Sequence, residues 1–294
     1  MMKGGCDVET YQEKTASVEG IHKISVETQS LDVELIQSES DELQATLCGE
    51  HSEDEARHIE LELLRRDDEL RVRITQQGHL SMFHIVGGIW NKYLRFTVYV
   101  PDRLFERITA SGQSSDMMAK RLMAGEMIFL CRSGDIQLDD CVAKETLNVR
   151  ASSGDITLNG VLGKGDVSVQ NSSGDIDCRG LTGETISIGT HSGDLTVSDY
   201  RGRLRAEAKS GDIEIKSDVL AGDVAIHSSS GDVALAYRQA DSFLVHYKGS
   251  SGEGKIRMEG LSYEEKSEHL IVGKKGDGRY RVDVRTSSGD FVLQ

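Results

Sequence analysis

The sequence predicts an all-β protein, a single-stranded parallel β-solenoid with coils of about 20 residues and a β-rich N-terminal cap. Three observations predict this fold. The tripeptide Ser-Gly-Asp recurs seven times, in segments such as "SSGDITLNG" at 152–160. Short apolar-polar-apolar triplets accompany the copies. Glycine occurs 31 times and proline once, so the chain can make many turns while almost every residue keeps its backbone N–H for a sheet.

The spacing of the tripeptide is nearly constant. Its copies fall at 133–135, 153–155, 173–175, 192–194, 210–212, 230–232 and 288–290, with Ser251-Gly252-Glu253 as a variant. From Gly134 to Gly252 each copy follows the last after about 20 residues, and a gap nearly twice as long leads to Gly289. A fixed period of this length is typical of stacked-repeat proteins.

Each period contains two short strands. Ile156 and Leu158 flank Thr157, and Val167 and Val169 follow with the same alternation, which indicates strands with one buried face. Two strands and two turns then make one flattened coil. Each strand pairs with its copy about 4.8 Å away in the next coil. A meander of antiparallel hairpins explains the pattern less well, because it does not require the same turn in every period.

The recurring Gly and Asp residues form the candidate turn column. Glycine supplies the positive φ of a tight corner, and Asp can accept hydrogen bonds from turn N–H groups. The column comprises Gly134, Asp135, Gly154, Asp155, Gly174, Asp175, Gly193, Asp194, Gly211, Asp212, Gly231, Asp232, Gly289 and Asp290.

Carboxylates stacked in this way repel one another by about 1 kcal/mol per neighbouring pair in water. Backbone N–H donors in each turn, or bound cations such as Ca²⁺, would offset the repulsion. One Asp per coil, with few further oxygen ligands beside it, favours the N–H donors. The sequence therefore predicts no metal site and no cofactor.

The flanking segments are expected to close the solenoid. We expect a tail at 1–19, a β-rich cap at 20–109 and the repeats at 110–294, with an inserted loop near 262–275. Within the cap, Ser30-Leu31-Asp32 repeats the turn motif without its glycine. Strand-like runs follow at 43–47, 59–64, 70–74 and 94–100. The polar segment "SEDEARH" at 52–58 is predicted to be a solvent-exposed connection.

Residues 79–93, "HLSMFHIVGGIWNKY", interrupt the cap and hold the single Trp of the chain. A lid folded over the core is one interpretation. The other is an apolar patch for docking a partner or a membrane surface. The candidate docking residues are Phe83, Ile85, Ile89 and Trp90. His79 and His84 lack a third ligand, which argues against a metal site there.

Composition excludes several classes of function. The formal net charge of −15 argues against nucleic acid as a partner, since phosphate binding needs clustered Lys and Arg. No apolar run reaches the roughly 20 residues that span a bilayer, and the N-terminus lacks the apolar stretch of a signal peptide. We expect a monomer or a weak homo-oligomer that is cytoplasmic or associated with the envelope.

The cysteines give no sign of a disulfide framework. There are five of them, Cys6, Cys48, Cys131, Cys141 and Cys178, and their spacing fits neither a metal ribbon nor a redox pair. We expect reduced thiols, with Cys178 buried in place of the Leu or Val of other coils.

Four segments resemble the bacterial putative-adhesin family of β-strand-repeat proteins, a domain of unknown function. They are "IHKISVETQSLDVELIQ", "LRFTVYVPDRLFERITASG", the serial "SSGDI" coils and the closing "GDGRYRVDVRTSSGDFVLQ". The likeness covers roughly residues 20–294. It implies a right-handed, parallel β-helix-like solenoid and, for some members, association with membranes or with envelope stress. It supplies no catalytic residues.

The sequence predicts no enzyme. The nearest carboxylate pair, Asp177 and Glu214, would lie two coils apart, about 10 Å. His191, Ser192 and Asp194 share one tight turn and so cannot easily form a relay. We therefore expect a non-enzymatic binding or scaffold protein, adhesin-like or linked to envelope stress, whose partner is an unidentified protein or glycan. Two alternatives stay open, a carbohydrate-active β-helix enzyme (a lyase or hydrolase) and a cation-stabilised structural repeat.

Overall fold

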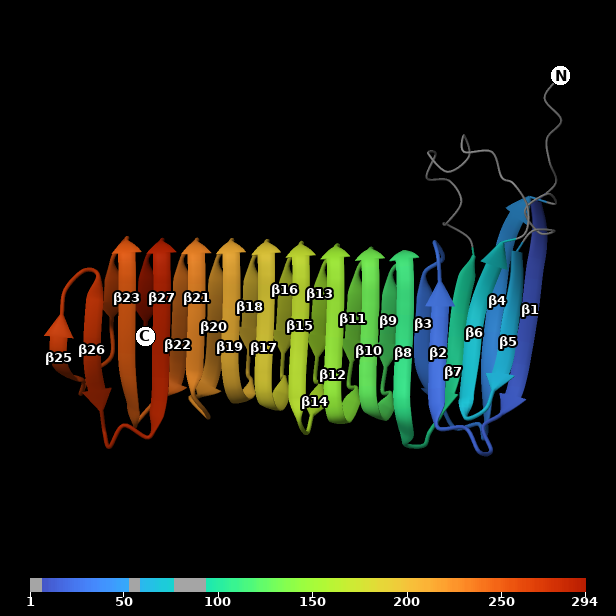
Figure 1. Ribbon diagram of the computed structural model, residues 1–294, viewed down its shortest axis with the longest axis horizontal. Coiled ribbons are helices and arrows are strands. Elements are labelled where there is room, and N and C mark those ends of the chain that lie inside the picture. The colour runs from blue at the N-terminus through green and yellow to red at the C-terminus, as the bar shows by residue number, and fades with distance from the viewer. Residues whose placement is uncertain (1–6, 53–58, 77–93) are drawn as a thin grey trace, which may run out of the picture.

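A computed structural model describes the protein over residues 7–52, 59–76 and 94–294. These residues form strands, turns and bends, and among them no helix is long and apolar enough to cross a membrane. Their strands make two sheets that lie face to face along an elongated molecule (Figure 1). This is the β-solenoid that the repeats predict.

The first sheet has thirteen strands within the described residues, and we call it the narrow sheet because its central strands are short. In spatial order it consists of β1 (Asp7–Ser17), β4 (Glu42–Ser52), β7 (Arg95–Pro101), β3 (Val33–Ser38), β9 (Met117–Lys120), β11 (Ile136–Asp139), β13 (Ile156–Asn159), β16 (Ile176–Arg179), β18 (Leu195–Ser198), β20 (Ile213–Val219), β22 (Val233–Gln239), β28 (Phe291–Leu293) and β24 (Gly254–Ile256).

The second sheet, the broad sheet, has longer central strands and faces the viewer in Figure 1. In spatial order it consists of β25 (Ser262–Lys266), β26 (Leu270–Lys275), β23 (Phe243–Ser251), β27 (Tyr280–Ser288), β21 (Val224–Ser230), β19 (Arg201–Ser210), β17 (Thr182–Ser192), β15 (Asp166–Ser173) beside β14 (Leu162–Gly163), β12 (Val142–Ser153), β10 (Met123–Ser133), β8 (Phe105–Ser114), β2 (Lys23–Thr28), β6 (Glu69–Gln76) and β5 (Ile59–Arg66).

Each coil runs from a broad strand through the Ser-Gly-Asp corner into a narrow strand, and a second corner leads to the next broad strand. Neighbouring coils pair in parallel and in register. Leu147 of β12 lies beside Val167 of β15, and Ile156 of β13 lies beside Ile176 of β16. Equivalent residues of successive coils therefore form columns along the long axis.

The core is a continuous apolar layer between the two sheets. The strands alternate inward apolar and outward polar residues, so Ile156 and Val167 are no more than 1% exposed. Each such side chain contributes about 1.5–3 kcal/mol relative to exposure. One buried cluster extends from Val18 to Leu293, and β8 crosses residue 110 without interruption. The cap and the repeats thus share one core.

The expected tail at 1–19 is wrong for residues 7–17. They form β1, which pairs antiparallel with β4 along its whole length. The segment lacks the apolar alternation of the coils, and backbone pairing to a neighbouring strand is what makes it a strand. The Gln12 side chain also donates to Ile59 O and accepts from Leu61 N, both at 2.9 Å, and so ties β1 to β5 across the end of the solenoid.

The C-terminal region departs from the expected order of coils. The segment near 262–275 is an antiparallel hairpin of β25 and β26, which extends the broad sheet beyond β23, and not a loop. The chain then returns, and β27 pairs between β21 and β23 while β28 pairs between β22 and β24. The last coil in sequence is therefore the second-last coil in space.

Candidate binding surface

The Asp residues of the turn column are joined to one another by hydrogen bonds. The carboxylate Oδ1 of Asp155 accepts the backbone N–H of Asp175 at 2.8 Å, and Asp175 accepts from Asp194 in the same way. We call the joined residues the aspartate file. In stacking order they are Asp32, Asp116, Asp135, Asp155, Asp175, Asp194, Asp212, Asp232, Asp290 and Glu253.

These bonds explain how acidic residues can stack. An N–H donor stabilises each accepting carboxylate and offsets its repulsion from neighbours. The donor comes from the next coil, so every bond also fixes one coil on another. No group of three or more His, Cys, Asp or Glu side chains within the described residues has the arrangement of a metal site.

The glycines beside the file are required by the close stacking of the corners. In stacking order they are Gly134, Gly154, Gly174, Gly193, Gly211, Gly231, Gly289 and Gly252. At Gly174, φ is +120° and a Cβ would lie 2.2 Å from Gly154 O. A side chain at this position would therefore clash with the neighbouring coil whatever its rotamer.

Asp116 belongs to the file although the Ser-Gly-Asp pattern does not predict it. Its turn, Ser114-Ser115-Asp116, lacks the glycine that marks the other copies. The signal that could have found it is its position one period before Asp135.

At the end of the file, burial raises the pKa of Asp32, and the N–H of Asp116 opposes that shift. At the other end the Glu253 side chain leaves the file and pairs with Lys255 at 2.6 Å.

The candidate catalytic groups are held apart. Asp177 and Glu214 lie in one outward column with Thr196 between them, and they pair with Arg179 and Lys216 respectively. The turn that contains His191 and Asp194 does not bring these two side chains together either. His191 Nε2 lies 2.9 Å from Lys209 Nζ, whereas the Asp194 carboxylate accepts from Asp212 N.

Cys48, Cys131, Cys141 and Cys178 are free thiols. Burial raises the pKa of Cys141 to about 11 and raises that of Cys178 further, so both are protonated at neutral pH. The proposed docking residues Phe83, Ile85, Ile89 and Trp90, together with His79 and His84, lie outside the described residues.

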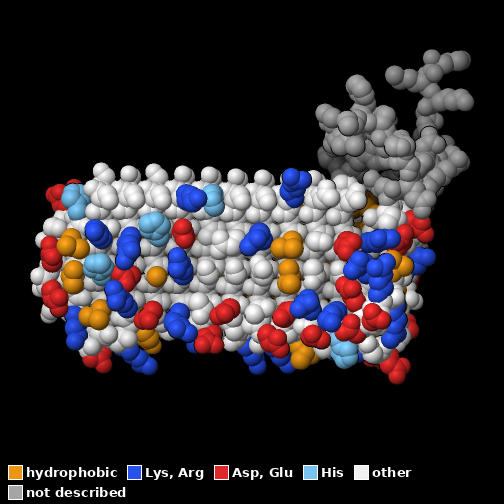
Figure 2. Space-filling model, viewed as in Figure 1, with side chains coloured by type: hydrophobic (Ala, Val, Ile, Leu, Met, Phe, Trp, Pro, Cys, Tyr) orange, Lys and Arg blue, Asp and Glu red, His pale blue; other side chains and the backbone are white. Residues whose placement is uncertain are grey.

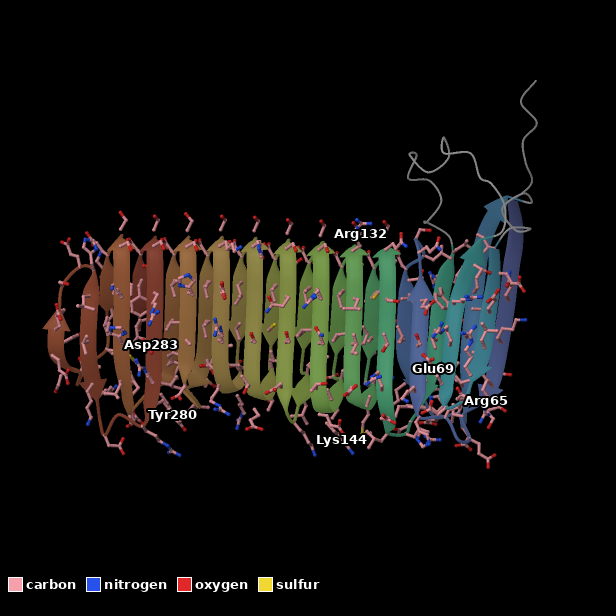
Figure 3. The ribbon with its side chains drawn as sticks, viewed as in Figure 1. Arg65, Glu69, Arg132, Lys144, Tyr280 and Asp283 are labelled. Atoms are coloured by element: carbon pink, nitrogen blue, oxygen red, sulfur yellow. The ribbon has the colours of Figure 1, made fainter. Side chains whose placement is uncertain are left out.

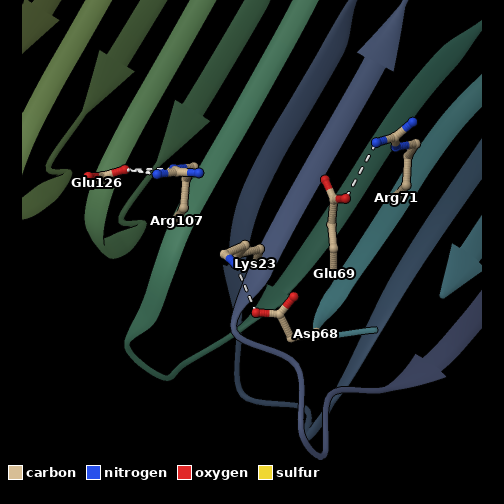
Figure 4. A network of polar contacts seen from close by, with 6 residues as sticks. All are labelled: Lys23, Asp68, Glu69, Arg71, Arg107 and Glu126. Atoms are coloured by element: carbon tan, nitrogen blue, oxygen red, sulfur yellow. Dashed lines mark hydrogen bonds and ion pairs between the residues drawn. The ribbon is translucent and has the colours of Figure 1, made fainter. Parts of the chain in front are cut away.

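The outer face of the broad sheet is polar and charged. Near the cap its charges are paired, Lys23 with Asp68 at 2.9 Å, Arg71 with Glu69 at 3.4 Å and Arg107 with Glu126 at 2.5 Å (Figure 4). Farther along the same face, side chains project from successive coils toward solvent (Figure 3). The solenoid thus offers a long flat surface whose side chains repeat at the strand spacing.

The sequence pattern of a family described as Toastrack DUF4097 matches residues 21–294. A solved structure described as a putative lipid binding protein from Parabacteroides distasonis ATCC 8503 is 12% identical, with a TM-score of 0.50 over 97% of each chain. The likeness shows a common fold.

A putative adhesin from Bacteroides fragilis NCTC 9343 is 14% identical, with a TM-score of 0.45 over 97% of each chain. A putative adhesin from Parabacteroides distasonis ATCC 8503 is 15% identical, with a TM-score of 0.45 over 76% of this chain and 96% of the other. None of the curated proteins matches this chain.

Proposed function

The chain belongs to the Toastrack DUF4097 family, and on that premise we propose that it is a non-enzymatic scaffold that binds a component of the bacterial envelope through its sheet surfaces. The observation that carries this proposal is the stacked architecture itself. Coils tied in register by the aspartate file hold two outer faces in fixed geometry. Binding to such a pre-formed surface costs little ordering of the protein.

The proposal predicts retention on envelope material. Purified protein is incubated with cell walls, with membranes and, as a control, with the cytosolic fraction of a bacterium, and bound protein is measured after sedimentation. We expect saturable binding to one of the two envelope fractions. Equal recovery from all three fractions would contradict an envelope scaffold.

The second candidate function is a carbohydrate-active enzyme, and Asp177 is the residue that would reveal it. Asp177 lies on the outer face of the narrow sheet in a column with Thr196. A panel of neutral and acidic polysaccharides is incubated with wild type, Asp177→Ala and, as a matched control in the same column, Thr196→Ala. Cleavage that is lost in Asp177→Ala and kept in Thr196→Ala would establish an enzyme and overturn the scaffold proposal.

A further inference from the structure

Exposed Lys, Arg and His side chains are spread over the half of the broad sheet that adjoins the Ser-Gly-Asp corner (Figure 2). Six of them lie in two adjacent rows of the register: Arg150, His227, Arg285 and Lys248 in one row, and Arg132 and Lys209 in the row two residues nearer the corner. They lie on six strands between β10 and β23. We call them the cationic stripe, and they are Arg132, Arg150, Lys209, His227, Arg285 and Lys248, His227 being a cation only when it is protonated. In the paired register His227, Arg285 and Lys248 are immediate neighbours on three consecutive strands.

The charges of the stripe are not neutralised by acidic side chains. None of the six side chains forms an ion pair within the part of the chain that the structure describes, and Lys209 contacts His191 instead. Some outward cations of the same sheet are paired, as Arg107 is with Glu126 and Arg203 with Glu184, whereas Lys144 and Arg201 form no ion pair within the described residues. The chain has 49 acidic and 34 basic residues, so acidic partners are abundant. Six cations without ion pairs, grouped on one half-face of an acidic protein, suit an external anion.

The shape of the stripe limits the anion to a thin, extended chain. From β10 to β23 there are seven strand spacings, about 34 Å. Along the strands its two rows lie two residues apart, roughly 7 Å. On one side lie the exposed carboxylates of the aspartate file. On the other side lie acidic residues near the opposite ends of the strands, such as Asp166 and Asp223. A flat anionic membrane would meet these carboxylates as well as the cations.

Neutral polar groups lie between the cations and suit a hydroxylated chain. Gln170 faces outward on β15 in the row of Arg150, and Ser187 faces outward on β17 in the row that adjoins it. They border a notch of about 120 Å³ above Gly189, where no side chain projects. Glu207, a carboxylate within the stripe, lies 3.8 Å from Arg205. The stripe has no Phe, Tyr or Trp, the side chains on which single-stranded nucleic acids stack.

We propose that the cationic stripe binds a linear acidic polysaccharide, whose carboxylate or sulfate groups contact the six cations while its hydroxyl groups bond to the polar side chains between them. The sugar chain lies along the solenoid axis. This inference rests on the proposed binding function and names the chemical class of the ligand.

The test compares two triple variants with the same loss of positive charge. The stripe variant carries Arg150→Gln, Lys209→Gln and Arg285→Gln. The control variant carries Lys144→Gln, Lys164→Gln and Arg201→Gln, three exposed cations near the opposite ends of the broad strands. Binding of polygalacturonate is measured by titration at low and physiological salt, with neutral dextran, oligothymidylate and anionic lipid vesicles as further probes. Circular dichroism and the thermal midpoint establish that both variants are folded.

We expect wild type and the control variant to bind polygalacturonate, and the stripe variant to bind it about tenfold more weakly, the loss expected for three exposed ion pairs. Salt should weaken binding, and dextran should not bind. Equal loss in both variants, or tighter binding of oligothymidylate or vesicles, would overturn the inference. Wild type that binds envelope fractions but not polygalacturonate would overturn the inference alone, whereas failure to bind any envelope fraction would overturn the proposed function.

Discussion

The backbone N–H of Asp175 donates a 2.8 Å hydrogen bond to the carboxylate of Asp155 in the preceding coil. Through this bond the acidic residue of one corner binds the backbone of its neighbour in the stack. The side chain of one coil supplies the acceptor for the backbone of the next, which makes the carboxyl oxygen more important to the stack than the negative charge.

Substitutions at Asp155 separate these two properties. Asp155→Ala removes the acceptor and should lower the free energy of unfolding by about 1 kcal/mol. Asp155→Asn keeps an oxygen acceptor and removes one charge from a row of like charges. It should therefore lie within about 0.5 kcal/mol of wild type or be more stable. Urea unfolding measures both, and an Asn variant as unstable as the Ala variant would contradict this account.

The same geometry predicts that stability does not depend on a divalent cation. Nine hydrogen bonds of the aspartate file use backbone N–H groups as the partners of the carboxylates. Thermal unfolding is followed with EDTA, without it, and over a series of CaCl₂ concentrations. We expect the same midpoint throughout. A midpoint that rises with Ca²⁺ and saturates would show that the folded state binds the ion.

Glycine at the Ser-Gly-Asp corner should be far less replaceable than glycine at the second corner. At Gly174 a Cβ would lie 2.2 Å from a backbone oxygen and φ is +120°, whereas at Gly180 the nearest heavy atom is 3.6 Å away and φ is +66°. Gly174→Ala should cost about 3 kcal/mol or more, and Gly180→Ala about 1 kcal/mol. Denaturant unfolding of the two variants compares them, and similar losses would contradict the close stacking.

The order of the C-terminal coils can be tested by cross-linking. His227 of β21 lies directly beside Arg285 of β27, whereas Lys248 is one strand farther away. In a background with Cys6→Ser and Cys48→Ser, the pair His227→Cys with Arg285→Cys should form a disulfide on mild oxidation. The pair His227→Cys with Lys248→Cys should not, because its Cα atoms are about 10 Å apart. A disulfide in the second pair alone would show that the coils stack in sequence order.

The sequence predicts the individual coils but not the order in which the C-terminal coils stack. The alternation at Ile156 and Leu158 and the glycine at Gly154 predict a coil, because the local pattern and the corner geometry agree. The period predicts that Gly252 follows Gly231 in the stack, but Gly289 lies between them. The two possible neighbours carry nearly the same tripeptide, Ser251-Gly252-Glu253 and Ser288-Gly289-Asp290, so the sequence does not show which coil occupies which position.

The candidate surface was predictable only in part. The Gly and Asp column follows from spacing, since each member occupies the same place in its coil. The cationic stripe does not, because Lys209 and Arg285 come to lie in adjacent rows through the register of coils far apart in the sequence. Their lack of acidic partners in the described structure is likewise a property of the assembled face. The strand β1 was missed because its residues pair without apolar alternation.

The pH dependence of stability should carry a contribution from Asp283. Burial raises the pKa of this carboxyl, but hydrogen bonds from His246 and Arg281 outweigh burial and leave the pKa below its usual value of 3.8. Because the folded-state pKa is depressed, the carboxylate contributes stability above about pH 4, and that contribution is lost as the pH falls through the folded-state pKa. Asp283→Asn should cost up to about 1 kcal/mol at pH 7 and progressively less in acid.

The free energy of unfolding of wild type and of Asp283→Asn, measured from pH 7 down to pH 2.5, gives the comparison. Asp166→Asn is the matched control, an exposed carboxylate of the same sheet without an ion pair in the described structure. We expect the curves of wild type and Asp283→Asn to converge as the pH falls, because protonation of Asp283 removes the interaction that the variant already lacks. A difference that stays constant with pH would show that the carboxylate at position 283 acts through packing and not through its charge.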